Sequence, residues 1–313
     1  MKFNSYQKVA IATVGATIFL IFVGGLVRAA GAGLGCPDWP KCFGMWIPPT
    51  DVSQLPSGFD ASLFNPWLTW IEYINRLIGV VIGLLIVATF GLSFRYRTSK
   101  PTIFWASLAA LVLVIFQGWL GGQVVETELS EWLITAHMVV AMIIVNILLY
   151  AAFSATESVF SSALPRGERK LFFWLGIALM ASTMIQLWFG TQVREAVDHI
   201  TNNSPDLARS TWLAAIGTKH FVHRSFAWLP LLIGAFLTWK VVKGRSSPIV
   251  TKLSVLVLAL ILFQIVLGVG LNYLGMPPTF QILHLTFFAI LVCAEFLFLL
   301  VTAKSQEYEL VES

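Results

Sequence analysis

Three histidines in this sequence recur at matched positions of an internal repeat. The pattern Phe-Gln-x-x-Leu-Gly at 116–121 is followed by His137, and the same pattern at 263–268 is followed by His284. In both copies the His comes 20 residues after the Gln. Paired imidazoles in an apolar protein are ligands that hold heme iron from its two sides. We therefore predict that these histidines bind heme iron, and that Gln117 and Gln264 join helices by hydrogen bonds.

A second repeat supplies the residues that face these histidines. Residues 72–76 are Glu-Tyr-Ile-Asn-Arg, and residues 220–224, which lie 148 positions later, are His-Phe-Val-His-Arg. His223 can thus oppose His284, whereas Asn75 takes the place opposite His137. An amide is a poor iron ligand beside imidazole. We expect a firmly held heme between His223 and His284, and a five-coordinate or weakly held one at His137 that is open to exchange and chemistry.

Glu72 could carry that chemistry, because it precedes Asn75 by three residues and lies on nearly the same helix face. A carboxylate there could act as a base or position a water molecule. The alternative is an i,i+4 salt bridge to Arg76, and both interpretations stay open. His220 takes the place of Glu72 in the second copy. It is expected to support the site or a heme propionate rather than to ligate iron.

Repeated arginines fit the two anionic propionates of heme, which need cations near the headgroup level. Arg76 matches Arg224, and Arg28 matches Arg194 with an offset of 166. The alternative for each one is an interaction with lipid phosphate. The larger offset of the second pair places the extra residues in a long outer segment, 30–66.

Membrane helices must position these residues. The chain is 57% hydrophobic and 12% charged, against about 25% charged in soluble domains. Eight apolar runs each reach the roughly 20 residues that cross a bilayer as a helix. The runs are 9–29, 67–91, 102–124, 132–153, 171–193, 214–239, 253–274 and 280–303. Their even-numbered members place Asn75 and the three histidines at their outer ends, and His199 falls in an outer loop.

Basic residues predict the orientation. Most of the 20 Lys and Arg residues fall on one side, which the positive-inside rule makes cytoplasmic, so both termini lie inside. They are Lys2, Lys8, Arg95, Arg97, Lys100, Arg166, Arg169, Lys170, Lys240, Lys243, Arg245, Lys252 and Lys304. The net charge of +4 therefore needs no nucleic acid to explain it. A multi-pass protein of the cell inner membrane is predicted.

The repeat predicts two halves of one design. Residues 1–155 form an N-terminal four-helix bundle, 156–170 a polar cytoplasmic linker, and 171–313 a C-terminal four-helix bundle. The fold class is thus all-α integral membrane, with eight transmembrane helices in two pseudo-symmetric bundles. Cys36 and Cys42 lie in the outer segment, where an oxidising compartment favours a disulfide. A redox-active thiol pair is the alternative.

Taken together, these residues resemble the heme A synthase family, from Gly24 to about Cys293. The most specific stretches are Gly-Leu-Gly-Cys-Pro-Asp-Trp-Pro-Lys-Cys at 33–42 with Pro48-Pro49, Glu-Tyr-x-x-Arg at 72–76, and the two Gln…His repeats. The resemblance implies an enzyme that oxidises the C8 methyl group of heme O to a formyl group. The product, heme A, serves cytochrome oxidase.

The resemblance also implies roles for individual residues. His223 and His284 would hold a heme b cofactor, His137 would bind the substrate heme O, Glu72 would be catalytic, and Cys36 would pair with Cys42. Many family members have His where this chain has Asn75, which departs from the family pattern. The enzyme that makes heme O is a candidate partner, beside membrane lipid and an unidentified electron donor or acceptor.

Two other functions compete with this one. A non-enzymatic b-type cytochrome would move electrons between quinol and a partner, and would be expected to keep two equal heme sites. A heme carrier or oxidase assembly factor would bind heme reversibly and make no product. The unequal pairs of ligands favour the enzyme over the cytochrome.

Overall fold

A computed structural model describes residues 3–156, 160, 162–165, 167–204, 206–244 and 246–308. In this part of the chain, eight helices are long and apolar enough to cross a membrane, as predicted. They are Ser5–Ala29, Pro66–Tyr96, Pro101–Glu126, Glu131–Ala155, Glu168–Thr201, Thr218–Lys243, Pro248–Tyr273 and Pro278–Lys304. Which side each end faces stays a prediction from the basic residues.

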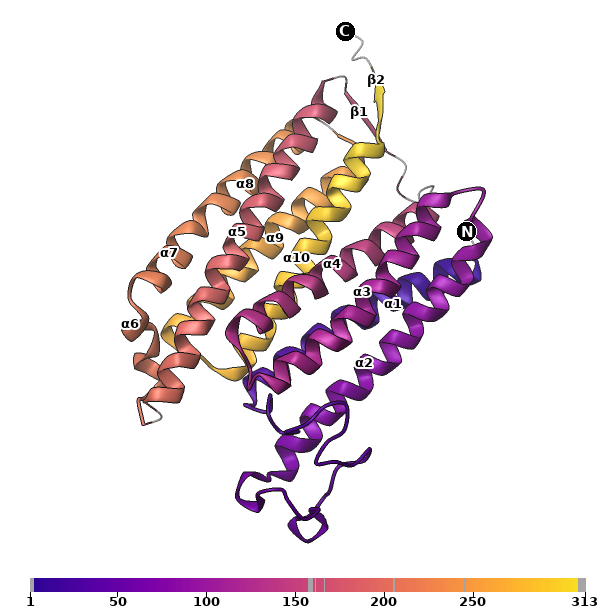
Figure 1. The fold of residues 1–313 in the computed structure, drawn as a ribbon. Helices are drawn as coiled ribbons and strands as arrows, with labels where there is room; N and C mark the ends of the chain where they lie inside the picture. Colours follow the sequence, from indigo (N-terminus) through magenta and orange to yellow (C-terminus); the bar gives the residue numbers. More distant parts are fainter. Residues whose placement is uncertain are drawn as a thin grey trace. The chain divides into compact units, whose positions relative to one another are not determined.

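The chain divides into two compact units, Met1–Ala155 and Thr156–Ser313. The first contains α1 (Ser5–Ala29), α2 (Pro66–Ser93), α3 (Pro101–Glu126) and α4 (Glu131–Ala155). Each helix packs against two neighbours, in the cyclic order α1, α2, α3, α4, which makes a four-helix bundle (Figure 1). Apolar side chains of α2, α3 and α4 meet in its core, among them Ile82, Ile86, Ala110, Ile144 and Leu148.

Local sequence sets where these helices begin. The Asn4 side chain accepts a hydrogen bond from the Gln7 backbone N–H, and the Gln7 side chain accepts one from the Asn4 backbone N–H. These two bonds form a capping box at the start of α1. Asn65 caps α2 by accepting from Trp67 and Leu68, with Pro66 as the first helical residue. A short 3-10 turn, η3 (Phe94–Tyr96), closes the far end of α2.

The second unit repeats the bundle with more irregular helices. It contains α5 (Glu168–Asn203), η5 (Arg209–Thr211), α6 (Trp212–Ile216), α7 (Thr218–Phe226), α8 (Trp228–Lys243), α9 (Pro248–Tyr273) and α10 (Pro278–Lys304). Helix α5 packs on α7, α8 and α10, and α9 packs on α8 and α10. Pro230 explains the break between α7 and α8, because proline lacks an N–H and its ring conflicts with the carbonyl four residues earlier.

Helix α5 is longer than predicted, and this corrects one expectation. Its 36 residues span about 54 Å at 1.5 Å per residue, well beyond the hydrocarbon core. The apolar run ends at the membrane surface, but the helix can continue through polar residues beyond it. Arg194 pairs with Asp198 at 2.9 Å one turn later. His199 therefore lies exposed on α5 and not in a loop.

Small elements complete the chain. Two three-residue strands, β1 (Ala163–Pro165) and β2 (Gln306–Tyr308), pair in parallel with Ala163 opposite Gln306. Strand β1 lies within the predicted linker 156–170. Residues 157–159, 161 and 166 of that linker lie outside the described residues, as do Lys2 and Arg245.

The predicted outer segment, 30–66, has a small core of its own. It carries two 3-10 turns, η1 (Val52–Gln54) and η2 (Ala61–Leu63). Cys36 and Cys42 form the predicted disulfide and pack with Phe43 and Phe64. Tyr73 of α2 packs against this cluster, so the segment is attached to one end of α2 (Figure 1).

The core of the second unit contains a buried carboxyl group at a position where the first unit has leucine. Glu295 of α10 is 2% exposed. Its Oε1 accepts from Thr183 Oγ1 at 2.8 Å, and its Oε2 is buried with no hydrogen-bond partner. The repeat places Leu148 at the matching position of the first unit. There the threonine that matches Thr183, Thr17, donates to a carbonyl of its own helix at 2.8 Å.

We expect Glu295→Leu to stabilise the protein by about 1–3 kcal/mol, because it removes an unsatisfied buried polar group. Thr183 can then bond to its own helix, as Thr17 does. Thermal unfolding in detergent would measure the change, with Glu295→Gln as a control that keeps a buried polar group and gains less. A lower unfolding temperature for Glu295→Leu would show that the carboxyl group stabilises this core.

Candidate functional site

In three helical hairpins, a glutamine of the first helix donates a side-chain N–H to the backbone carbonyl of a histidine in the second. The pairs are Gln117 and His137 at 3.0 Å, Gln186 and His223 at 2.9 Å, and Gln264 and His284 at 3.1 Å. Such interhelical bonds fix two membrane helices at one depth and rotation. The predicted helix-joining role of Gln117 and Gln264 is confirmed.

Each imidazole also lies against a glycine one turn after that glutamine. A Cβ atom added at Gly121 would lie 3.3 Å from Cε1 of His137, and one at Gly190 would lie 3.3 Å from Cε1 of His223. The corresponding distance from Gly268 to His284 is 3.9 Å. The glycines therefore make room for the edge of the imidazole ring.

The three imidazole rings are unengaged at one of their two nitrogens. Nδ1 of His137, His223 and His284 is buried in each case and has no hydrogen-bond partner among the described residues. His223 and His284 are near enough to interact electrostatically. No group of three or more His, Cys, Asp or Glu that could hold a metal ion occurs in the described part of the chain. A pair of imidazoles with apolar surroundings fits heme iron, which the porphyrin already ligates in its plane.

Asn75 takes the place of a fourth histidine in the repeat. It is half-buried on α2, and its Oδ1 is buried without a hydrogen-bond partner. The first unit thus offers one imidazole, that of His137, and one amide. The second unit offers two imidazoles.

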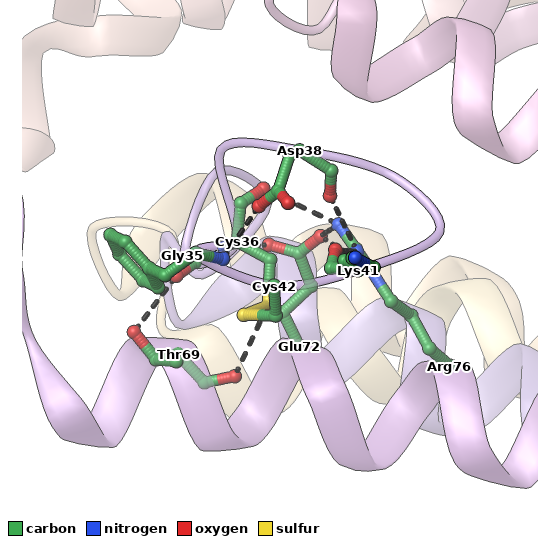
Figure 2. A network of polar contacts seen from close by, with 9 residues as sticks. Gly35, Cys36, Asp38, Lys41, Cys42, Thr69, Glu72 and Arg76 are labelled. Carbon is green, nitrogen blue, oxygen red and sulfur yellow. Dashed lines mark hydrogen bonds and ion pairs between the residues drawn. A yellow bond between two sulfur atoms is a disulfide. The ribbon is translucent and has the colours of Figure 1, made fainter. Parts of the chain in front are cut away.

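Glu72 and Arg76 form the predicted salt bridge one turn apart on α2 (Figure 2). Glu72 is 4% exposed, and its Oε2 accepts the Cys36 N–H at 2.8 Å. Arg76 Nε donates to Glu72 Oε1 at 3.1 Å. The carboxylate is therefore held between the helix and the outer segment.

The guanidinium of Arg76 also donates hydrogen bonds to that segment. Its guanidinium donates to the carbonyl oxygens of Asp38 at 2.7 Å, Lys41 at 2.8 Å and Cys36 at 3.3 Å. The ring closed by the Cys36–Cys42 disulfide is thus bound to α2 through its main chain (Figure 2). These contacts are to protein groups, and the heme-facing role predicted for Arg76 stays a prediction.

Close packing brings the segment onto the helices. A Cβ atom at Gly35 would lie 2.4 Å from the Leu68 carbonyl oxygen, so only glycine fits there. Thr69 Oγ1 donates to the Gly35 carbonyl at 2.8 Å. The Trp39 ring packs against α3, because a Cβ atom at Gly122 would come within 2.8 Å of it. The segment therefore covers the end of α2 near Pro66 and the end of α3 near Glu126.

The family of cytochrome oxidase assembly proteins matches this sequence over residues 7–296. The chain belongs to this family. The resemblance drawn from the sequence is thereby confirmed at the level of the family.

Curated relatives of this family member carry the name Heme A synthase. The protein from Wolbachia sp. subsp. Brugia malayi (strain TRS) is 27% identical over 309 residues, which cover 88% of this chain and 90% of the relative. The protein from Bartonella tribocorum is 23% identical over 316 residues, with 88% and 86% covered. The protein from Shewanella oneidensis is 31% identical over 136 residues, which cover 42% of this chain and 40% of the relative.

The other residues predicted to meet heme propionates in this cytochrome oxidase assembly protein lie on α1, α5 and α7. Arg194 donates to Gln281 Oε1 at 3.0 Å, three residues before His284. Arg28 and His220 are half-buried, and Arg224 is exposed on α7. Their roles toward propionates stay predictions.

Gln186 is a site residue of this family member that the sequence analysis missed. It belongs to the spacing Gln-x-x-x-Gly, which also occurs at 117–121 and 264–268. A search for that spacing before each histidine would have found it. The internal comparison alone did not, because its matching residue in the first unit is Leu20.

We expect Gly190→Ala to lower the amount of bound heme, although alanine favours a helix over glycine by about 1 kcal/mol. The new methyl group would press on the His223 ring. The absorbance of extracted heme per protein would measure the loss. Gly83→Ala is the control, because a Cβ atom at Gly83 meets nothing within 4 Å. Equal heme contents would mean that His223 moves without consequence.

Proposed function

We propose that this chain is a heme A synthase, which oxidises the C8 methyl group of heme O to a formyl group. Its relatives named Heme A synthase and its family support this proposal. The observation that carries it is the inequality of the two units. The sequence repeat pairs His137 with an amide, Asn75, whereas it pairs His284 with a second imidazole, His223. An electron carrier has no need of that difference, but an enzyme with one resident and one transient heme does.

In the second unit, His223 and His284 would hold a resident heme b. When bound, that heme supplies one-electron transfer to and from the substrate. Gln186 and Gln264 hold the backbone of the two ligands in place. Arg194, Arg224 and His220 are proposed to meet its propionates, since a guanidinium can bind a carboxylate through two parallel hydrogen bonds.

In the first unit, His137 would bind the iron of heme O, with Asn75 on the opposite side. Arg28 and Arg76 are proposed to meet the substrate propionates. The apolar outer surfaces of this bundle would let heme O enter from the lipid with its hydrocarbon tail still in the membrane. The product would leave by the same route for cytochrome oxidase.

Glu72 is proposed as the catalytic carboxylate, which takes a proton from the reacting group or orients a water molecule. Both of its oxygens are engaged in the structure, by Arg76 and by the Cys36 N–H. Oε2 accepts a single bond, from the Cys36 N–H, so it keeps a lone pair that could take the proton.

The proposed setting is the cell inner membrane, where heme O and the oxidase are embedded. An electron donor or acceptor is required, and the enzyme that makes heme O is a candidate partner. No nucleic acid is expected to bind.

One experiment separates the candidate functions. The chain is co-expressed with an enzyme that makes heme O, and extracted hemes are separated by chromatography with mass detection. A heme A synthase yields heme A that is absent without the chain. A b-type cytochrome yields two reducible hemes and no new species, and a carrier yields heme O that washes out. Either of the latter two results would overturn the proposal.

A further inference from the structure

The support of each histidine has two parts that recur together. A glutamine bonds the backbone carbonyl of the histidine, and a glycine four residues after the glutamine accommodates the ring. The arrangement occurs in the hairpins α3–α4, α5–α7 and α9–α10. Two of these belong to the second unit and one to the first, so the support follows the histidine and not the unit.

The remaining hairpin, α1–α2, keeps only one part. The offset that matches Arg28 to Arg194 places Leu20 at the position of Gln186 and Gly24 at that of Gly190. Asn75 matches His223. A Cβ atom at Gly24 would meet nothing within 4 Å, so no described side chain lies against Gly24 as His223 lies against Gly190.

Leu20 has joined the apolar core instead. It packs against the cluster that includes Ile82 and Ile86 of α2. A leucine has no N–H with which to hold the Asn75 carbonyl, and Asn75 Oδ1 is buried without a partner. The α1–α2 hairpin therefore lacks both the histidine and the glutamine that would support it.

We propose that Gln117, Gln186 and Gln264 are positioning residues for the three histidines. We further propose that Leu20 and Asn75 together leave the first unit with a single protein ligand for iron. The inference rests on the heme sites of the proposed function, but not on its reaction. A histidine alone at position 75 would lack the bond that sets its depth, so both residues must change to make a second axial ligand.

Gln186→Leu tests the support by loss. Purified protein with its bound heme is examined by electron paramagnetic resonance and by absorbance in the ferric state. We expect part of the low-spin signal of the second unit to become high-spin, and heme transfer to a soluble heme-binding protein to become roughly threefold faster. Gln192→Leu is the matched control on α5, because Gln192 donates to the Glu195 side chain and not to a histidine carbonyl. Equal spectra for wild type and Gln186→Leu would overturn the positioning role.

Leu20→Gln with Asn75→His tests it by gain. The double variant should hold a second low-spin heme in the first unit, whereas Asn75→His alone should give a mixture of spin states. If the single variant matched the double one, Leu20 would have no part in the difference. If neither gave a low-spin heme, the α1–α2 hairpin would not face the iron. If the wild-type chain made no heme A while these spectra were as expected, the proposed reaction alone would be overturned.

Discussion

Replacing His284 with Ala is expected to lower the heme retained by the second unit at least about tenfold. The resident iron would lose one of two imidazoles, and a buried apolar site offers no water of comparable strength. Purification followed by a heme-to-protein ratio from absorbance measures the effect. His223→Ala should give the same result, because the two histidines have the same support from Gln264 and Gln186.

Two further histidines serve as controls. His199→Ala should keep full heme, because His199 is exposed on α5. His137→Ala should keep most of the resident heme and lose heme A. If His284→Ala retained as much heme as His199→Ala, the assignment of His284 as an axial ligand would be wrong.

Replacing Glu72 with Gln is expected to lower heme A formation by about a hundredfold or more, the usual loss when a general base is removed. Glutamine keeps the size of the side chain and can still accept the Cys36 N–H. It removes the negative charge that faces Arg76. The ratio of heme A to heme O in extracts measures the product, while bound heme b should be unchanged.

Glu72 could instead serve only to anchor the outer segment, and a second variant separates this role from catalysis. Arg76→Ala removes the same ion pair but keeps the carboxylate, and it also frees three loop carbonyls. The rate at which a reductant opens the Cys36–Cys42 disulfide reports how firmly the loop is held. If Glu72 only anchors the loop, both variants will lose heme A in step with faster reduction. If Glu72 is the base, Glu72→Gln will lose heme A while the disulfide stays protected.

Most of the fold could be predicted because its signals are local. Apolar runs bounded by charge predicted the eight spans, and the repeats placed three histidines on even-numbered spans. The continuation of α5 to Asn203 was not predicted, because a polar helix beyond the membrane has no hydropathy signal. The break before α8 depends on Pro230, whose effect on a membrane helix varies with the neighbours that replace its missing bond.

The site could be predicted only where both copies of the repeat agree. Gln117 and Gln264 match each other, so they were visible, whereas Gln186 matches Leu20 and was hidden. The partners of Arg76 were beyond the reach of sequence, since they lie 35 to 40 positions earlier in an irregular segment. Its fold depends on close fits such as Gly35 on the Leu68 carbonyl, which no spacing reveals.

Arg76 holds the outer segment through main-chain oxygens alone, those of Cys36, Asp38 and Lys41. Every type of amino acid offers the same oxygen, so this attachment is indifferent to which side chains the segment displays. Lys41, which is exposed, could change its charge or size without releasing the segment. Substitution of an exposed side chain on this ring can therefore leave the buried ion pair beneath it untouched.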